Sequence, residues 1–434
     1  MCRDTGKGHF VFLQLTGSTE QVAPITWGQE YMRRGLEPHR PNEGWTNGAT
    51  NIDATGMRLE TITAYLKAVE GVLSKYDVFR THFSVSEGGI VRQVVLKQLS
   101  APVTVFNNDE AARFDCDAFR QAPFDLWAQP LFRVALEERA NKPVRLHIAW
   151  SHLLLDAWSS RTVVRDLTAA LSSSQIATGT YVQPVARADW EISQGGQTYN
   201  ERSLQYWKKL LPRFLAAYPT AQDHTFRPPA RFLIGELEAP KLVSAAKQAA
   251  AAIRVSTATV LIGSVCVMVS DILNLHDLPF LVRTSNRAGK FASTIGQLSQ
   301  DAPVIFEYNA GLVAGSLQDL HRGLLLAQRY GAYAPADLET TMSSAPANAS
   351  DLRVLINCHE ATGKQAREIS QKDAKSQDSF AWVSQRSFDP VLFYVDIFPD
   401  EERLVFMVNT DFISATIFEA AIPGLVDTPI RTMD

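Results

Sequence analysis

The strongest constraint in this chain is an uncharged stretch of sixteen residues, Val255–Ser270, bounded by Arg254 and Asp271. Such a stretch has to be buried, either in a membrane or in a protein core, because burial of apolar surface is favourable. A membrane-spanning helix needs about 20 apolar residues, whereas this stretch is shorter and contains several Ser and Thr residues. We therefore expect a buried core helix here and no membrane span.

The composition is that of a globular protein, and it argues against one class of partner. The chain has 434 residues, of which 46% are hydrophobic and 20% charged. At roughly 150 residues per domain, this length allows two or three domain-sized units. Lys and Arg number 42 against 46 Asp and Glu, a net charge of −4. Binding to nucleic acid phosphates needs a concentrated basic face, so we expect no nucleic acid partner.

The N-terminus and the cysteines indicate a reducing compartment. Residues 1–7 contain no apolar segment of the kind found in signal peptides. The four cysteines lie far apart and form no Cys-x-x-Cys pair, which argues against a structural zinc site. Scattered single cysteines fit a cytoplasmic protein that needs no disulfides.

Hydrophobic periodicity predicts a mixture of helices and strands. Helical spacing occurs over 58–74, from Ser159 onward, around Trp207, and over 240–253 and 255–273. Strand patterns occur at 94–95, 103–106, 131–136, 145–150, 279–284, 354–358, 391–397 and 403–408. The two types do not alternate as they do in a doubly wound sheet, which favours an α+β fold.

Polar stretches suggest where the chain divides. Residues 172–183 have the composition of a connection, and 184–206 are polar and are predicted to be rich in loops. We place a boundary there, which gives an N-terminal half, 1–183, and a C-terminal half, 184–434. The most polar segment, 368–378, is predicted to be a mobile loop.

Several common catalytic motifs are missing from the sequence. There is no Gly-x-Gly-x-x-Gly and no P-loop, since the segment Asn-Arg-Ala-Gly-Lys-Phe lacks a Ser or Thr after Lys290. There is no Gly-x-Ser-x-Gly elbow, no His-Glu-x-x-His and no kinase signature. Nucleotide-dependent hydride transfer, P-loop ATP use and elbow-type serine hydrolysis are therefore disfavoured.

One constellation could carry chemistry, at the end of the strand predicted at 145–150. Leu146, Ile148 and Trp150 share one face of this strand, and Arg145, His147 and Ala149 the other. Directly after it come His152 and, four residues later, Asp156. Functional groups often occupy such positions, yet His-x-x-x-Asp also arises by chance and suits a structural or surface histidine. His147 lies on the polar face, but no third metal ligand can be identified, so we expect no metal site.

The segment Ser151–Ala157 resembles the His-His-x-x-x-Asp-Gly motif of the condensation domains of nonribosomal peptide synthetases, members of the chloramphenicol-acetyltransferase-like superfamily. Further segments resemble other parts of this family in the same order along the chain. They are 24–30, 75–83, 123–126 with 130–133, 188–190, 206–207, 285–287 and 295–303. Each is weak alone, but their order and spacing over roughly 20–420 are specific.

The chain also departs from the family pattern. The first motif His is Ser151, the Gly after Asp156 is Ala157, and the fifth motif is degraded at Gln300–Asp301. No clear seventh motif is present. The leading Asp of heterocyclisation domains, the extra motif of epimerisation domains and the distal motif of plant-type acyltransferases are absent as well. The His-Glu pair at His359 lies in another context, on a strand end.

The resemblance implies a fold of two acetyltransferase-like halves that form a V-shaped pseudo-dimer with a tunnel between them. It implies an acyl transfer from a carrier-protein thioester to an amine or hydroxyl. His152 is the expected catalytic residue, because imidazole titrates near working pH. Ser151 and Ala157 are expected to be structural replacements at the active site. Trp158 and Gly296 are candidates for the substrate tunnel, although Trp158 has the alternative of packing the turn.

Asp156 is expected to be structural. A carboxylate beside Leu153–Leu155 should be drawn inward, and a buried carboxylate needs a partner. The resemblance offers Arg287 as first choice, because it lies in the second half and would join the halves, and Arg80 as second choice. The alternative is that Asp156 only caps the helix that begins near Ser159.

The resemblance implies that the chain has no cofactor of its own and that a 4'-phosphopantetheine arm arrives on a carrier protein in trans. We expect a free-standing, cytoplasmic, monomeric enzyme of natural-product biosynthesis, such as antibiotic biosynthesis, with a small amine or alcohol as a possible acceptor. Two alternatives stay open. One is a catalytically silent condensation-like module that recruits a partner, and the other is a coenzyme A-dependent acyltransferase.

Overall fold

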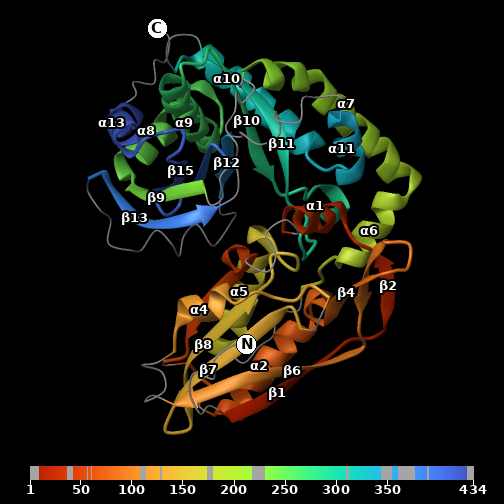
Figure 1. Cartoon of the computed structure of the whole chain (residues 1–434). Helices are drawn as coiled ribbons and strands as arrows, with labels where there is room; N and C mark the ends of the chain where they lie inside the picture. Colours follow the sequence, from red (N-terminus) through yellow and green to blue (C-terminus); the bar gives the residue numbers. More distant parts are fainter. Residues whose placement is uncertain are drawn as a thin grey trace. The chain divides into compact units, whose positions relative to one another are not determined.

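The computed structural model forms two compact units (Figure 1). It describes residues 9–36, 43–55, 57–59, 61–107, 114–127, 130–173, 179–217, 230–308, 312–343, 354–359, 377–388 and 391–427. The first unit comprises residues 1–198 and 285–299, and the second comprises 199–284 and 300–434. Along the chain, the first division between the units falls inside helix α7 (Gln194–Ala217), whereas the boundary expected from the sequence, at 183/184, falls at the start of helix α6 (Pro184–Ile192). Most of the loop expected at 368–378 lies outside the described residues.

The first unit is built on a five-stranded sheet and a smaller three-stranded one. The larger sheet has the order β1 (His9–Thr16), β6 (Gln98–Asn107), β7 (Phe132–Arg139), β8 (Lys142–Trp150) and β3 (Gly48–Asp53). Only β6 and β7 are parallel within it. The smaller sheet has the order β2 (Gln21–Pro24), β5 (Val91–Val95) and β4 (Thr81–Val85). Strands predicted at 94–95, 103–106, 131–136 and 145–150 all fall on these elements.

Three helices of the first unit, α2, α4 and α5, contact the larger sheet, and α6 contacts β2 of the smaller one. The helices of this unit are α1 (Trp27–Leu36), α2 (Ile62–Ser74), α4 (Cys116–Gln121), α5 (Ala157–Ser173) and α6, with short 3-10 helices η2 (Glu43–Thr46), η3 (Asp77–Arg80) and η4 (Gly289–Phe291). Helix α2 begins where Thr61 caps it, accepting a hydrogen bond from the backbone N–H of Ala64. Its apolar stripe, which includes Tyr65 and Val69, is buried in contact with β1, β8 and α5.

Helix α6 and the first part of α7 correct one prediction. The segment 184–206 is not rich in loops, because only Ser193 separates the two helices. Pro184 occupies the first turn of α6, where its missing N–H costs nothing. The segment is polar because α6 buries a charged pair, Arg187 and Glu191, four residues apart. Polarity was therefore a poor guide to loop structure here.

The second unit contains a seven-stranded mixed sheet. Its strand order is β11 (Gln300–Glu307), β10 (Asp277–Thr284), β12 (Val354–Cys358), β14 (Phe393–Phe398), β15 (Arg403–Asn409), β9 (Ala230–Glu238) and β13 (Ser379–Phe388). Only the pairs β10–β12 and β12–β14 are parallel. Its further helices are α8 (Pro240–Ile253), α9 (Thr257–Leu273), α10 (Ala314–Tyr330), α11 (Pro335–Met342) and α13 (Ala415–Asp427).

Helix α9 carries the uncharged stretch and lies at the centre of this unit. It begins at the cap Ser256, whose side chain accepts from the backbone N–H of Thr259, and twelve of its residues are buried. It contacts α8, α10, α13 and the strands β10 and β12. The prediction of a buried core helix is therefore confirmed. Among the described residues, no single helix is long and apolar enough to cross a membrane, and only the bent pair of α8 and α9, taken together, has the required length and composition.

A short segment from late in the sequence completes the first unit. Residues 285–299 follow β10 but belong to the first unit. The Thr26 hydroxyl donates to the backbone carbonyl of Gln297 at 3.1 Å. Helix α1 approaches this segment so closely that a Cβ on Gly28 would lie 2.5 Å from the Cα of Leu298, so only glycine fits there. The segment brings Arg287 to the end of β8.

Candidate active site

The turn after β8 holds His152 between buried residues. Ser151 directly follows β8, and its backbone N–H donates to the carbonyl of Leu131 at 2.9 Å. The Ser151 carbonyl accepts from the N–H of Leu154 at 2.9 Å, and its hydroxyl accepts from the N–H of Leu153 at 3.3 Å. Leu153, Leu154 and Leu155 are all buried. His152 is half-buried and sits within the turn that these contacts define.

The predicted ion pair between Asp156 and Arg287 is present. The Nη1 atom of Arg287 donates to Oδ2 of Asp156 at 2.7 Å, and Nη2 donates to Oδ1 at 3.0 Å. The Asp156 side chain is 2% exposed and that of Arg287 3%. Both residues belong to the first compact unit, so the pair lies within that unit, contrary to the expectation that it joins two halves. The reason is that residues 285–299 fold with the first unit.

Backbone N–H groups complete the environment of Asp156. Its carboxylate accepts from the N–H of Leu298 at 3.0 Å, from Ser299 at 3.2 Å and from Ser159 at 3.0 Å. Burial alone would raise the pKa of Asp156, but the Arg287 guanidinium and these hydrogen bonds outweigh burial and hold the pKa below its usual value. The bond to Ser159 also caps α5. Asp156 therefore fills both roles weighed from the sequence.

Ser159 joins the ion pair to the backbone of Gly296. Its Oγ accepts from Nη2 of Arg287 at 2.7 Å and from the N–H of Gly296 at 2.9 Å, and it donates to the Gly296 carbonyl at 2.8 Å. A Cβ on Gly296 would lie 2.8 Å from Cγ of Pro184, so a larger residue does not fit there. Sequence reasoning treated Ser159 as uninformative and gave it no role.

Of the other residues expected at the site, Trp158 contacts the ion pair of Asp156 and Arg287, whereas Arg80 does not. The guanidinium of Arg287 lies over the ring of Trp158, 4.6 Å from its centroid, so Trp158 packs on the ion pair. Ala157 is exposed and begins α5. Arg80 does not pair with Asp156. Arg80, the last residue of η3, is buried. Its guanidinium donates hydrogen bonds to the carboxylate of Asp77 and to the backbone carbonyl of Leu96 instead.

Comparison with known proteins identifies the family. The model of the condensation domain matches residues 61–379. The chain belongs to the condensation domain family. A plipastatin synthase of Bacillus subtilis is 30% identical over 169 residues, 36% of this chain, and tyrocidine synthase 2 of Brevibacillus parabrevis is 24% identical over 354 residues, 76% of it. The chain spans only 6% and 10% of the length of these two relatives.

Solved structures confirm the α+β, chloramphenicol-acetyltransferase-like fold. A condensation domain that mediates chain release from the enacyloxin polyketide synthase superimposes with a TM-score of 0.72 at 15% identity, covering 95% of this chain and 82% of that one. The condensation domain of the monacolin K polyketide synthase MokA gives 0.71 at 13% identity, covering 94% and 96%. At such identities the likeness concerns the fold alone.

His147 is the clearest correction within this condensation domain. It was expected on the polar face of the strand, but this face is buried at His147, because α4 and its neighbours cover it. Its side chain is buried against Phe106 and Phe114, and its Nδ1 lies 2.8 Å from Oδ1 of Asn51. Burial, with a smaller contribution from Arg145, lowers the pKa of His147 to about 4. In the part of the chain that the structure describes, no three His, Cys, Asp or Glu side chains could hold a metal ion.

A second buried carboxylate in the condensation domain was missed by sequence reasoning. Glu191 of α6 accepts from Nε of Arg187 at 2.7 Å and from the backbone N–H of Trp27 at 2.7 Å. The guanidinium of Arg187 lies beside two aromatic rings, 4.6 Å from the centroid of Trp190 and 4.9 Å from that of Phe291. Burial, opposed only in part by Arg187, raises the pKa of Glu191 to about 7. The i,i+4 spacing of Arg187 and Glu191 was the signal that could have found this pair.

Proposed function

We propose that this chain is an active condensation enzyme. It transfers an acyl group from a thioester on the 4'-phosphopantetheine arm of a carrier protein to an amine or hydroxyl acceptor. Membership of the condensation domain family supports the reaction class. The synthetases and synthases among its relatives support carrier proteins as partners. The arm belongs to the partner, so the enzyme supplies the binding surfaces and the proton chemistry.

The anchored turn after β8 is the observation that carries this proposal. Asp156 is tied by Arg287 and by three backbone N–H groups, which fixes the turn that bears His152. A fixed imidazole can accept the proton of an attacking amine or hydroxyl, or hold that nucleophile in line with the thioester. His152 is therefore the proposed catalytic residue, with Asp156 and Arg287 as positioning residues.

The two departures from the family motif are compatible with activity. The Ser151 hydroxyl accepts a hydrogen bond from within the turn, so it supports the shape that carries His152. Ala157 is the first residue of α5, and its backbone is not among the residues with positive φ, so glycine is not required there. Both observations favour an active enzyme over a catalytically silent module that recruits a partner.

The test is condensation by the purified chain, followed by intact-protein mass spectrometry. A carrier protein loaded with an acyl group is mixed with a panel of amines and alcohols, and the carrier should lose its acyl mass while the acceptor gains it. His152→Ala should lower turnover by about 10²-fold or more, the usual scale for a lost general base, with unchanged circular dichroism.

Ser151→Ala is the matched control at the neighbouring position, and it should keep measurable activity. Equal turnover in folded His152→Ala and in the unaltered chain would refute the catalytic role of His152. Transfer from a free coenzyme A thioester at the same rate as from the carrier would favour the coenzyme A-dependent alternative. No transfer with any acceptor of the panel would favour the silent module.

A further inference from the structure

The five-stranded sheet of the first unit ends in a strand that lacks the usual protection of a sheet edge. Strand β1 lies at one edge of this sheet (Figure 1). Its sequence, His-Phe-Val-Phe-Leu-Gln-Leu-Thr, contains no Lys, Arg, Asp, Glu, Pro or Gly. Its register with β6 runs without a bulge from His9 to Thr16. Edge strands offer unpaired backbone groups to other chains, and natural proteins usually interrupt them with charges, prolines or bulges.

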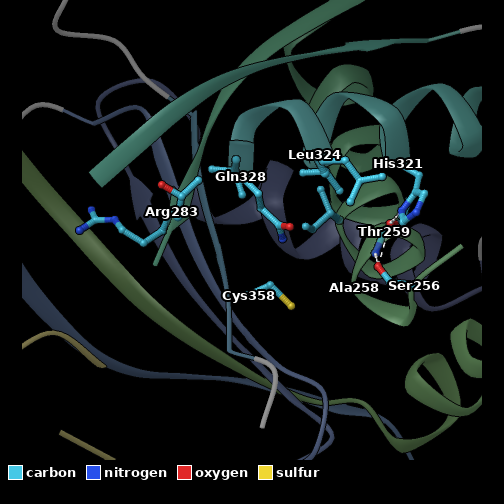
Figure 2. Close-up of a pocket in the computed structure, with 12 residues that line it drawn as sticks. Ser256, Ala258, Thr259, Arg283, His321, Leu324, Gln328 and Cys358 are labelled. Atoms are coloured by element: carbon cyan, nitrogen blue, oxygen red, sulfur yellow. Dashed lines mark hydrogen bonds between the residues drawn. The ribbon is translucent and has the colours of Figure 1, made fainter. Parts of the chain in front are cut away.

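The other edges of the two large sheets carry such interruptions. In the first unit, the opposite edge strand, β3, ends at Asp53. In the second unit, β13 has a bulge in its register with β9, and β11 contains Pro303. Helix α10 also packs on β11 and β10, and Figure 2 shows this helix, with Gln328, alongside the strand that carries Arg283. Among the described edge strands of these two sheets, β1 is therefore the one without a charge, a proline or a bulge.

Helix α2 closes the C-terminal half of the β1 edge. The backbone N–H of Gln14 donates to Oε2 of Glu70 at 2.7 Å. The backbone N–H of Thr16 donates to Oγ of Ser74 at 3.2 Å. Both acceptors belong to α2, so these two N–H groups point away from β6 and are already satisfied.

The N-terminal half of the edge is open and aromatic. Because backbone direction alternates along a strand, the N–H groups of Phe10 and Phe12 point away from β6, as that of Gln14 does. In the part of the chain that the structure describes, no hydrogen bond occupies these outward groups. Phe10 is 65% exposed and Phe12 58%, and both side chains lie on the same face of the sheet. The open half therefore presents both unpaired backbone groups and apolar surface.

The length and symmetry of the open half indicate its partner. A partner strand has to present outward-facing backbone groups to Phe10 and Phe12, and its pairing has to end before Gln14, whose N–H is occupied. A second β1 in antiparallel orientation meets both conditions when Phe10 of each copy lies opposite Phe12 of the other and Val11 lies opposite Val11. Each copy then satisfies the open groups of the other, as a two-fold interface requires. Since β1 has no acidic side chain, Lys or Arg, no like charges meet at this joint.

We propose that two copies of this chain pair through the open half of β1 and form a two-fold dimer, in which the two five-stranded sheets become one. Phe10 and Phe12 of the two copies form cross-strand aromatic pairs at the joint. One short strand pair with four rings is smaller than the roughly 1,200 Å² of stable interfaces, so we expect a Kd of about 10–100 µM. The dimer takes the place of the monomer expected from the sequence, because periodicity does not reveal which strand ends a sheet. It does not depend on the proposed condensation reaction.

Sedimentation velocity tests the dimer without substrate or carrier protein. Between about 1 and about 300 µM the unaltered chain should shift from monomer to dimer, given the expected Kd. Phe12→Lys places two like charges at the joint and should weaken association by at least about tenfold. Ile417→Lys, on α13 of the second unit and 53% exposed, is the matched control and should associate normally. A chain that stays monomeric at the highest concentration, or a dimer that persists in Phe12→Lys, would overturn the proposal.

A disulfide tests the register. Val11 lies on the two-fold axis of the proposed dimer as a non-hydrogen-bonded pair, in which the Cα atoms are about 4.5 Å apart. This spacing suits a disulfide, so Val11→Cys should give a covalent dimer on mild oxidation, seen by non-reducing electrophoresis. Cys2 and Cys116 are changed to serine in the parent chain to remove competing thiols. Val22→Cys, exposed on β2, is the matched control and should stay unlinked. Absence of linkage through Val11→Cys at concentrations where the parent is dimeric contradicts the pairing of β1 with β1.

Discussion

Two buried carboxylates in the first unit have opposite behaviour although each is paired with an arginine. Asp156 and Glu191 are each 2% exposed. Asp156 accepts two guanidinium N–H groups and three backbone N–H groups, and its pKa is lowered. Glu191 accepts one guanidinium N–H and one backbone N–H, and its pKa is raised to about 7.

The difference shows that a nearby arginine does not by itself keep a buried carboxylate ionised. Burial opposes the charged form of both groups. What separates them is the number of donors that face the carboxylate oxygens, since each additional hydrogen bond stabilises the anion. The Asp156 site is therefore a fixed ion pair, whereas Glu191 can change its protonation near neutral pH. Three substitutions can break or sharpen this comparison.

Removing the fixed ion pair should have the largest effect. Asp156→Ala leaves the buried guanidinium of Arg287 without its counterion and should lower the free energy of unfolding by about 3–5 kcal/mol. Urea denaturation at pH 7, followed by circular dichroism, measures this loss, and soluble yield and activity should fall with it. Asp117→Ala, at an exposed position on α4, is the control and should change stability by no more than about 0.5 kcal/mol. A loss below about 1 kcal/mol for Asp156→Ala would mean that the pair contributes little.

The Glu191 site should give a smaller effect that depends on pH. The folded-state pKa of Glu191, about 7, is above the unfolded value of 4.5, so between these values the folded chain binds the extra proton. Its contribution to stability is therefore present at pH 4.5 and is lost as the pH rises through 7, by up to about 3 kcal/mol. Glu191→Gln cannot ionise, so its stability should fall less between pH 5 and 8.

The measurement is the free energy of unfolding of both chains at intervals across this pH range. Glu87→Gln, at an exposed turn between β4 and β5, is the matched control and should follow the unaltered chain. Parallel curves for Glu191→Gln and the unaltered chain would show that Glu191 stays ionised like Asp156, and the contrast between the two sites would disappear.

Ser159 is the uncharged partner of the ion pair, and its loss should lower the free energy of unfolding least. Ser159→Ala removes a hydroxyl that bonds Arg287 and both backbone groups of Gly296, and should lower the free energy of unfolding by about 1–3 kcal/mol. Ser160→Ala, the next residue, whose hydroxyl bonds only the Ala157 carbonyl, should cost no more than about 0.5 kcal/mol. Equal costs for the two alanine variants would mean that the ion pair does not need Ser159.

The ion pair of Asp156 shows which parts of the structure could be predicted from the sequence. The ion pair between Asp156 and Arg287 could be predicted, because the apolar run before Asp156 demands burial and a buried carboxylate demands a partner. Its location within one unit could not, since the sequence does not reveal that 285–299 folds back onto an earlier part of the chain. The core helix α9 and eight of the described strands followed from periodicity, which reports local burial directly. The strands that it missed are β1, β2, β3, β4, β9, β11 and β13.

The misses have a common physical cause. A period of two assigns His147 to a face of β8, but it does not say that α4 and Phe114 cover this face. Polarity suggested loops over 184–206, but the charges of Arg187 and Glu191 satisfy each other inside a helix. In both cases the deciding partner comes from packing between elements, which local patterns do not contain.

Because residues 285–299 belong to the first unit, this unit cannot finish folding until they have been synthesised. N-terminal units generally fold during synthesis, before the rest of the chain is made. The first stretch of that unit ends at Thr198, and Arg287, the partner of Asp156, is made 89 residues later. Until then the nascent first unit carries a carboxylate without its counterion. The turn that bears His152 can therefore gain its ion pair between Asp156 and Arg287 only after β10 and the segment that follows it have been translated.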